Sequence, residues 1–218
     1  MIIIFIMAMG IAISTNLTFA SEDTITFEKG YAANSDELYQ MAQALVKRYA
    51  FLIELEDLGV TQDGKPIYVI RMTYNIYKYD AYDYVARTHI LIDGCVHARE
   101  TYNPGVILKT IEDYVKDYYS DAYLPGQNVR ELIQTSVIHF IPIINPDGFD
   151  VAKFGLQGIK NSEIRLKFSQ LIPDLNSSRL KGNLSGVDLN RNFEDIYFNT
   201  EADRKSTRLN SSHGKLPR

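Results

Sequence analysis

Four consecutive residues, His97-Ala98-Arg99-Glu100, combine side-chain types that can hold a metal ion. They follow an apolar run, residues 88–96, that predicts a buried strand, and they precede a helix start with Asn103 as cap and Pro104 in the first turn. A His and a Glu at this spacing can direct an imidazole nitrogen and a carboxylate oxygen at one ion. Zinc accepts that pair, and a catalytic zinc requires three protein ligands plus an open position for water. The motif alone is weak evidence, because His-x-x-Glu is common and usually forms a solvated polar pair.

Two further segments add weight to the metal interpretation. Residues 145–149, Asn-Pro-Asp-Gly-Phe, close a second apolar run, and residues 186–193, Gly-Val-Asp-Leu-Asn-Arg-Asn-Phe, lie further along the chain. In this order the three segments resemble the zinc carboxypeptidase family, the carboxypeptidase A-like metallopeptidases. Residues 58–70 are similar to the entry hairpin of that family, and the resemblance extends over residues 39–193.

The resemblance implies a role for each residue of the first motif. His97 and Glu100 match the first two zinc ligands of the family. A Zn²⁺ ion held there would lower the pKa of its bound water and polarise a scissile carbonyl. Arg99 matches a family arginine that helps to hold the peptide substrate, although on its own it could be a solvated surface charge.

Asn190 and Arg191 match the family pair that binds the terminal carboxylate of the substrate. A guanidinium group binds a carboxylate through two parallel hydrogen bonds, and a neighbouring amide adds a donor. Binding of this kind measures the distance from the chain end, so the expected partner is a peptide with a free C-terminal carboxylate.

The family also uses a second arginine, ahead of this pair, to stabilise the oxyanion. Two residues are candidates here, Arg179 and Lys181. Lys181 lies in the better register and Arg179 has the better chemistry, while Leu180 stands where the family has an aromatic residue. Both candidates stay open.

Composition limits the class of protein. The chain has 218 residues, of which 45% are hydrophobic and 23% charged, and this suits one globular domain with a real core. A formal net charge of −4 and the lack of a basic cluster argue against nucleic acid as a partner. Cys95 is the only cysteine, so no intrachain disulfide can form, and we expect a small buried residue rather than a zinc ligand or nucleophile.

The order of apolar patterns predicts an α/β sandwich in which helices flank a mixed sheet. Ligand sites in such sheets collect at the carboxyl ends of strands, where the 97–100 and 145–149 segments both lie. The expected elements are a helix at 36–49 with Ser35 as its cap, strands at 51–58, 66–72, 88–96 and 137–144, and a helix after Pro104 with Ile107, Ile111, Tyr114, Val115 and Tyr118 on one face.

Three other segments have no expected chemistry. Residues 21–33 are polar, and we expect them to be extended. Residues 145–149 have the composition of a tight turn that ends a strand. Residues 160–181 are charged, with an amphipathic pattern at 164–171, and are expected to form a surface insertion.

The N-terminal residues 1–20 resemble a signal peptide, because an apolar run at 2–13 is followed by small residues before the expected cleavage point. No Lys or Arg precedes that run, which is atypical. The run is shorter than the roughly 20 residues that span a bilayer, so we expect a secreted or extracytoplasmic protein without stable membrane insertion after cleavage.

The C-terminal residues 203–218 are expected to be a non-native tail, because residues 203–213 resemble a translated sequencing adapter. Residues 21–202 would then be a partial zinc carboxypeptidase catalytic domain, truncated at its C-terminal side. In the family, the third zinc ligand and the general-base glutamate follow the Asn-Arg pair at a distance that this chain does not reach. His89 and His139 lie inside expected strands and His213 lies in the tail, so we expect no catalytic residue to be present and this polypeptide to be inactive.

Three functions fit these patterns. The first is a zinc carboxypeptidase that removes C-terminal residues from peptides. The second is a murein-peptide endopeptidase of the same family, which cuts between γ-D-glutamate and a diamino acid. The third is a non-catalytic module that binds peptide carboxylates without zinc.

Overall fold

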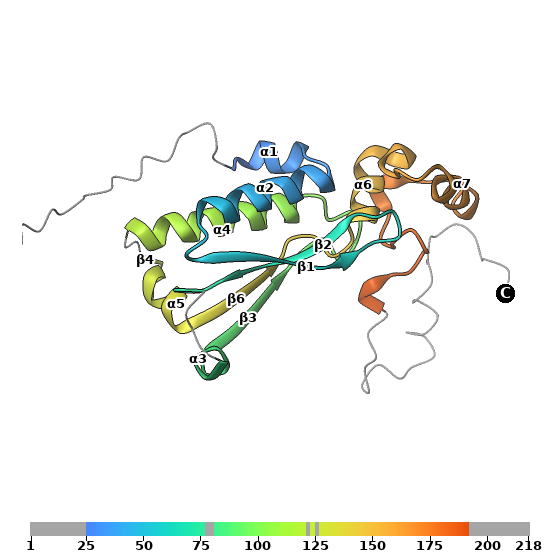
Figure 1. The fold of residues 1–218 in the computed structure, drawn as a ribbon. Coiled ribbons are helices and arrows are strands. Elements are labelled where there is room, and N and C mark those ends of the chain that lie inside the picture. Colours follow the sequence, from blue (N-terminus) through green and yellow to red (C-terminus); the bar gives the residue numbers. More distant parts are fainter. Residues whose placement is uncertain (1–24, 77–80, 121–122, 125–126, 192–218) are drawn as a thin grey trace, which may run out of the picture.

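A computed structural model describes residues 25–76, 81–120, 123–124 and 127–191 of the chain, and a four-stranded mixed sheet forms its centre (Figure 1). The three strands at one side of the sheet pair antiparallel, and the fourth pairs parallel with its neighbour. This arrangement confirms the predicted α/β class. The strands, in spatial order, are β1 (Ile53–Val60), β2 (Pro66–Met72), β6 (Ser136–Ile141) and β3 (Thr88–Asp93).

Helices α1 (Phe27–Ala32), α2 (Ser35–Arg48) and α4 (Asn103–Ser120) lie on one face of the sheet (Figure 1). The remaining helices lie at its two ends. Those at the end where β3 and β6 begin are α3 (Ala81–Ala86) and α5 (Val129–Thr135), and those at the end where both strands finish are α6 (Pro146–Phe154) and α7 (Ser162–Leu171). Short elements complete the described chain: β4 (Tyr123–Leu124), β5 (Gln127–Asn128) and the 3₁₀ turns η2 (Gly155–Gly158), η3 (Ser177–Arg179) and η4 (Leu189–Arg191).

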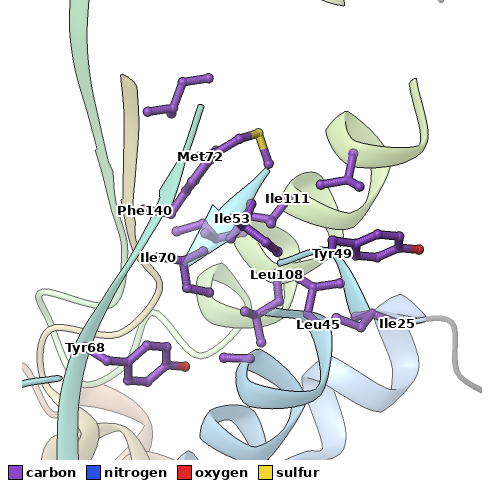
Figure 2. Packing of buried hydrophobic residues seen from close by; sticks show 14 of the residues in the cluster. Ile25, Leu45, Tyr49, Ile53, Tyr68, Ile70, Met72, Leu108, Ile111 and Phe140 are labelled. Atoms are coloured by element: carbon purple, nitrogen blue, oxygen red, sulfur yellow. The ribbon is translucent and has the colours of Figure 1, made fainter. Parts of the chain in front are cut away.

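The main core fills the space between the sheet and helices α2 and α4 (Figure 2). In β2, Ile70 and Met72 point into this core while Arg71 points away, as the two-residue period of a strand requires. The predicted apolar face of α4 is confirmed, since Ile107, Ile111, Val115 and Tyr118 are buried and Tyr114 packs against the cluster. Helix α4 begins at Asn103, one residue before the predicted start.

Two predictions about the N-terminal region were wrong. Residues 27–32 within the expected extended segment form helix α1. The cap of α2 is Asn34 rather than Ser35, because the Asn34 carboxamide accepts the Glu37 N–H at 2.9 Å and the Glu37 carboxylate accepts the Asn34 N–H at 2.7 Å. Ser35 is engaged elsewhere, since its hydroxyl and its N–H both donate to Asp150.

Residues 145–149 are not a turn but the start of helix α6. The Asn145 carboxamide oxygen accepts the Gly148 N–H at 3.0 Å and caps the helix, and Pro146 occupies its first turn. Residues 160–181 are likewise more than a surface insertion. Phe168, Ile172 and Leu180 of this segment are buried in a second apolar cluster together with Ala98, Val151, Ile159 and Leu184.

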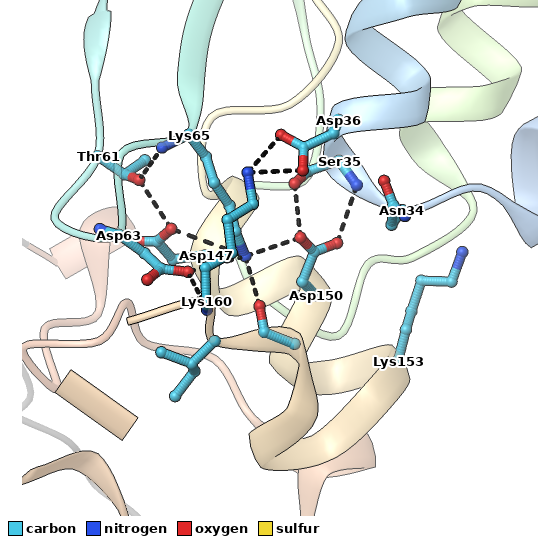
Figure 3. Close-up of polar contacts among 12 residues, drawn as sticks. Asn34, Ser35, Asp36, Thr61, Asp63, Lys65, Asp147, Asp150, Lys153 and Lys160 are labelled. Atoms are coloured by element: carbon cyan, nitrogen blue, oxygen red, sulfur yellow. Dashed lines mark hydrogen bonds and ion pairs between the residues drawn. The ribbon is translucent and has the colours of Figure 1, made fainter. Parts of the chain in front are cut away.

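A buried lysine joins the β1–β2 hairpin to this part of the fold (Figure 3). The Lys65 ammonium group is fully buried and lies 2.7 Å from Asp150, 3.5 Å from Asp63 and 3.9 Å from Asp147, and it also donates to the Gly158 carbonyl at 2.7 Å. Each carboxylate has further donors: the Thr61 hydroxyl donates to Asp147, and the Lys160 and Asn161 N–H groups donate to Asp63. Burial nevertheless raises the pKa of Asp147, more than the nearby donors and Lys65 lower it.

We expect Lys65→Ala to lower the free energy of unfolding by about 3–5 kcal/mol, because it leaves buried carboxylates without their cation. Lys167→Ala is the matched control. Lys167 pairs with Glu163 on the surface of α7, where both side chains are more than 70% exposed, so its loss should cost only about 0.3–0.5 kcal/mol. Urea unfolding of the two variants measures the difference, and equal effects would show that the buried network contributes no more than a surface ion pair.

The sheet face opposite the helices carries a histidine pair. His89 of β3 and His139 of β6 stack with their ring nitrogens 3.0 Å apart, and His89 also contacts the Tyr84 carbonyl at 2.9 Å. Arg71 lies opposite His139 in the β2–β6 register and pairs with Glu54 and Glu56. Burial, with smaller effects from His89 and Arg71, lowers the pKa of His139 from its ordinary value of 6.5.

This lowered pKa predicts a loss of stability in weak acid. Below about pH 6.5 the unfolded chain takes up a proton at residue 139 before the folded chain does, so the free energy of unfolding falls until the pH reaches the folded pKa. The urea concentration at the midpoint of unfolding should therefore be lower at pH 5.5 than at pH 7.5. The difference between the two pH values should be smaller in His139→Gln than in the unmodified protein. An identical decrease in both proteins would contradict the assignment.

Candidate active site

The turn between β3 and α4 brings His97 and Glu100 into direct contact. Their Nδ1 and Oε1 atoms are 2.7 Å apart, and the other Glu100 oxygen accepts the His97 N–H at 3.1 Å. The backbone closes the same turn, because the Glu100 N–H donates to the His97 carbonyl at 3.0 Å. Partial burial raises the pKa of Glu100, but the two hydrogen bonds from His97 outweigh it, so the pKa lies below the ordinary value.

The preceding residues direct the chain into this turn. Gly94 makes two backbone hydrogen bonds to residues at and just after the end of β6. Its N–H donates to the Ile141 carbonyl, and its carbonyl accepts the Ile144 N–H. Cys95 then adopts a left-handed conformation with a φ of 52°, and its carbonyl accepts the Asn145 N–H at 3.2 Å. The Cys95 side chain is fully buried, and burial raises the pKa of its thiol, which confirms the expectation of a small buried residue.

Residues 179–181, which include the two oxyanion candidates, pair with the turn at residues 97–100. The Ala98 N–H donates to the Lys181 carbonyl at 3.1 Å, and the Arg99 N–H donates to the Leu180 carbonyl at 3.0 Å. The side chain of Lys181 is half-buried and that of Arg179 is exposed. Two parts of the chain that are distant in sequence are thus fixed side by side through their backbones.

A tight loop then returns the chain to His97. The Asn183 carboxamide oxygen accepts the N–H groups of Ser185 and Val187 at 3.0 and 3.1 Å, and this loop leads to Asp188. One Asp188 carboxylate oxygen lies 3.4 Å from His97 Nε2, on the side of the ring opposite Glu100, and accepts the Asn190 N–H at 3.1 Å. Asp188 can therefore orient the imidazole ring. Sequence reasoning missed this role, although an acidic residue two positions before the Asn-Arg pair was a visible signal.

Asn190 and Arg191 follow in η4, and both are exposed. Arg99 is exposed as well. Among the described residues, no ion pair joins the guanidinium group of Arg99, Arg179 or Arg191 to a protein carboxylate. Their backbones lie on the segments that adjoin the His97 turn, but the structure shows no direct side-chain contact between these arginines and His97 or Glu100.

The His97–Glu100 pair has the donor chemistry that zinc prefers. Two ligands of a tetrahedral zinc with bonds of about 2.0–2.1 Å lie about 3.3 Å apart, so the observed separation of 2.7 Å requires only a small opening of the pair. The described part of the chain contains no cluster of three or more His, Cys, Asp or Glu residues suited to a metal ion. The pair therefore fits two positions of a zinc site.

A family model described as zinc carboxypeptidase matches residues 38–218. The chain belongs to the zinc carboxypeptidase family. This family acts on peptides and is named for its zinc ion. The match includes residues 203–218, which lie outside the described residues together with residues 1–20, so the non-native tail and the signal peptide both stay predictions.

Individual relatives agree with the family assignment. The chain is 25% identical over 157 residues to the uncharacterised protein YqgT of Bacillus subtilis, covering 71% of this chain and 38% of that protein. It is 24% identical over 170 residues to the carboxypeptidase N catalytic chain of Rattus norvegicus, covering 76% and 32%. The chain thus spans well under half the length of these two relatives.

A solved structure shares the fold. Bovine thrombin-activatable fibrinolysis inhibitor, in complex with a tick carboxypeptidase inhibitor, superposes with a TM-score of 0.54 at 19% identity, over 82% of this chain and 50% of that chain. Among the described residues, no helix has both the length and the apolar character needed to cross a membrane.

We expect the thiol of Cys95 to resist alkylation in the folded protein, because it is buried and its pKa is raised. Iodoacetamide at pH 8 should modify it only after unfolding in urea, as mass spectrometry of the intact chain can measure. Rapid modification without denaturant would mean that the end of β3 opens readily and that the site is not fixed as described.

Proposed function

We propose that this chain is the N-terminal part of the catalytic domain of a zinc metallocarboxypeptidase that hydrolyses the C-terminal peptide bond of peptides. The observation that carries the proposal is the pairing of residues 98–99 with residues 180–181. This pairing fixes a segment rich in cationic and amide side chains against the turn that contains His97 and Glu100. Such an arrangement suits a substrate whose scissile carbonyl and terminal carboxylate must be bound at once.

In this proposal His97 and Glu100 hold the zinc ion, and a third ligand and the general base come from residues outside the described ranges. Zinc, when bound, supplies an activated water and polarises the scissile carbonyl. Asp188 holds the His97 ring through Nε2, so that Nδ1 stays directed toward Glu100 and the ion.

The substrate carboxylate would bind Arg191 and Asn190. Exposure of both side chains supports this role, because a guanidinium group can bind a carboxylate through two parallel hydrogen bonds and the neighbouring amide adds a donor. Arg99 would contact the peptide, and either Arg179 or Lys181 would stabilise the oxyanion. The proposal includes export from the cytoplasm, which rests on the signal-like composition of residues 1–20.

The test uses the complete gene product, identified by sequencing the source locus beyond the codons for Asn190 and Arg191. We expect it to contain stoichiometric zinc and to release C-terminal residues from peptides. His97→Ala should lose both zinc and activity. Arg191→Ala should keep zinc but lose about 10- to 100-fold in kcat/KM, together with its preference for free over amidated C-termini. Lys167→Ala, an exposed change on α7, is the control that should match the unmodified protein.

Other results would redirect the proposal. Zinc-dependent cleavage of murein peptides without release of C-terminal residues from ordinary peptides would indicate the endopeptidase of the same family. Binding of free-carboxylate peptides without zinc or hydrolysis would indicate the non-catalytic module. The 218-residue polypeptide itself should be inactive, and parallel Arg179→Ala and Lys181→Ala variants of the complete protein identify the oxyanion residue by the larger loss of kcat.

A further inference from the structure

Asn145 connects the three segments that build the candidate site. It is 3% exposed, and its backbone N–H donates to the Cys95 carbonyl, two residues before His97. Its carboxamide nitrogen donates to the Gly182 carbonyl at 3.2 Å, while its carboxamide oxygen accepts the Gly148 N–H at 3.0 Å. The residue therefore contacts the end of β3, the start of α6 and the segment that follows Lys181.

We propose that Asn145 is a positioning residue for the reaction: its carboxamide holds residues 180–182 in place against the His97–Glu100 turn. This inference rests on the proposed function and assigns a role to a residue that the sequence suggested was only part of a turn. Asn145 would touch neither zinc nor substrate, and would act through the residues that do.

The pattern of hydrogen bonds singles out this side chain. The other bonds that join these segments, from Ala98 to Lys181, from Arg99 to Leu180 and from Asn145 to Cys95, run between backbone groups. Among the described hydrogen bonds of residues 180–182 to these segments, the one from the Asn145 carboxamide is the only one that a side chain donates, and His97 and Asp188 meet further along the loop. The position of the 180–182 backbone relative to the metal-ligand turn therefore depends on a group that substitution can remove.

A shift of the backbone at Gly182 would also move the residues proposed to bind substrate, Asn190 and Arg191. A Cβ atom added to Gly182 would lie 3.1 Å from the Val187 carbonyl oxygen and 3.2 Å from Gly186, so the two halves of the loop are in close contact. Asp188, Asn190 and Arg191 follow directly. Movement of residues 180–182 thus displaces the oxyanion candidates and the carboxylate-binding pair together.

The Asn145 carboxamide is itself held in place by close packing against Gly148. A Cβ atom at Gly148 would lie 2.5 Å from the Asn145 nitrogen and 2.8 Å from the Ala98 methyl group, so the three groups are packed without spare room. Orientation of the amide is unambiguous, because Gly148 offers a donor to one end and Gly182 an acceptor to the other. Such a locked group is suited to hold a site within the narrow tolerance that catalysis requires.

Helix capping alone is the competing explanation, and serine separates the two roles. Serine is a good N-cap and can accept the Gly148 N–H, but it is too short to reach the Gly182 carbonyl. Asn145→Asp also keeps the acceptor and removes the donor, and it serves as a second variant if the first fails to fold. Asn128→Ser is the matched control, because Asn128 caps α5 by accepting the Glu131 N–H at 3.1 Å, at the other end of the sheet.

The measurements use the complete, zinc-loaded gene product. We expect Asn145→Ser to keep its zinc content but to lose at least about tenfold in kcat/KM, with a reduced preference for free over amidated C-termini. Amide exchange at Ala98 and Arg99 should become faster, because their acceptors on residues 180–181 are no longer held. Asn128→Ser should change none of these quantities.

If Asn145→Ser behaves like Asn128→Ser, Asn145 is only a cap and the inference is overturned. Loss of zinc in Asn145→Ser would also overturn it. The inference has the carboxamide hold residues 180–182, whereas the proposed metal ligands His97 and Glu100 lie on a different segment. Should the unmodified protein lack zinc and hydrolysis, the proposed function fails, and unchanged exchange at Ala98 and Arg99 would then separately overturn the positioning role.

Discussion

The arrangement of the site depends on one buried cation, Lys65. Its ammonium group compensates three carboxylates that come from the β1–β2 hairpin turn and from the first turns of α6 (Figure 3). Asp150 in turn holds the first residue of α2. Desolvation of the charges is costly and offsets much of their attraction, so the complete network adds little net stability. Its main effect is to fix the position of the hairpin relative to α6, because removal of Lys65 would leave buried carboxylates uncompensated. In the observed placement of the hairpin against α6, each of the three carboxylates has the Lys65 cation and at least one hydrogen-bond donor.

The placement of α6 determines the rest. Asn145 stands at its first turn, and its hydrogen bonds reach Cys95 on one side and Gly182 on the other. The second apolar cluster contains residues from all three segments: Ala98 from the turn at residues 97–100, Val151 from α6, and Leu180. Apolar packing and backbone hydrogen bonds therefore act on the same three segments, which is how a site built from loops acquires a defined shape.

The sequence correctly predicted those elements and contacts that depend on residues close together in the chain. Strand β2, the hairpin and the apolar face of α4 follow from residues that are close in sequence, and the His97–Glu100 pair follows from a motif of four. The errors arose where a residue distant in sequence determines which hydrogen bonds a side chain makes. Ser35 did not cap α2 because Asp150 engages it, and Asp188 was overlooked because its contact with His97 joins two motifs that only the fold brings together. The acidic residue two positions before Asn190 was visible in the sequence, but its partner could be identified only from the fold.

The two sides of the site differ in how they meet a ligand. His97 and Glu100 are partly buried and already hydrogen-bonded to each other, so their relative position is fixed before any ligand binds. Arg99, Arg179 and Arg191 are exposed and solvated. Their charges gain full strength only when a bound peptide excludes water, because Coulomb attraction rises as the local dielectric constant falls. In the proposed function, discrimination for a terminal carboxylate would then arise on binding, while the fold would set the position of the ion. The alignment of the two sides depends on the backbone hydrogen bonds between residues 98–99 and residues 180–181.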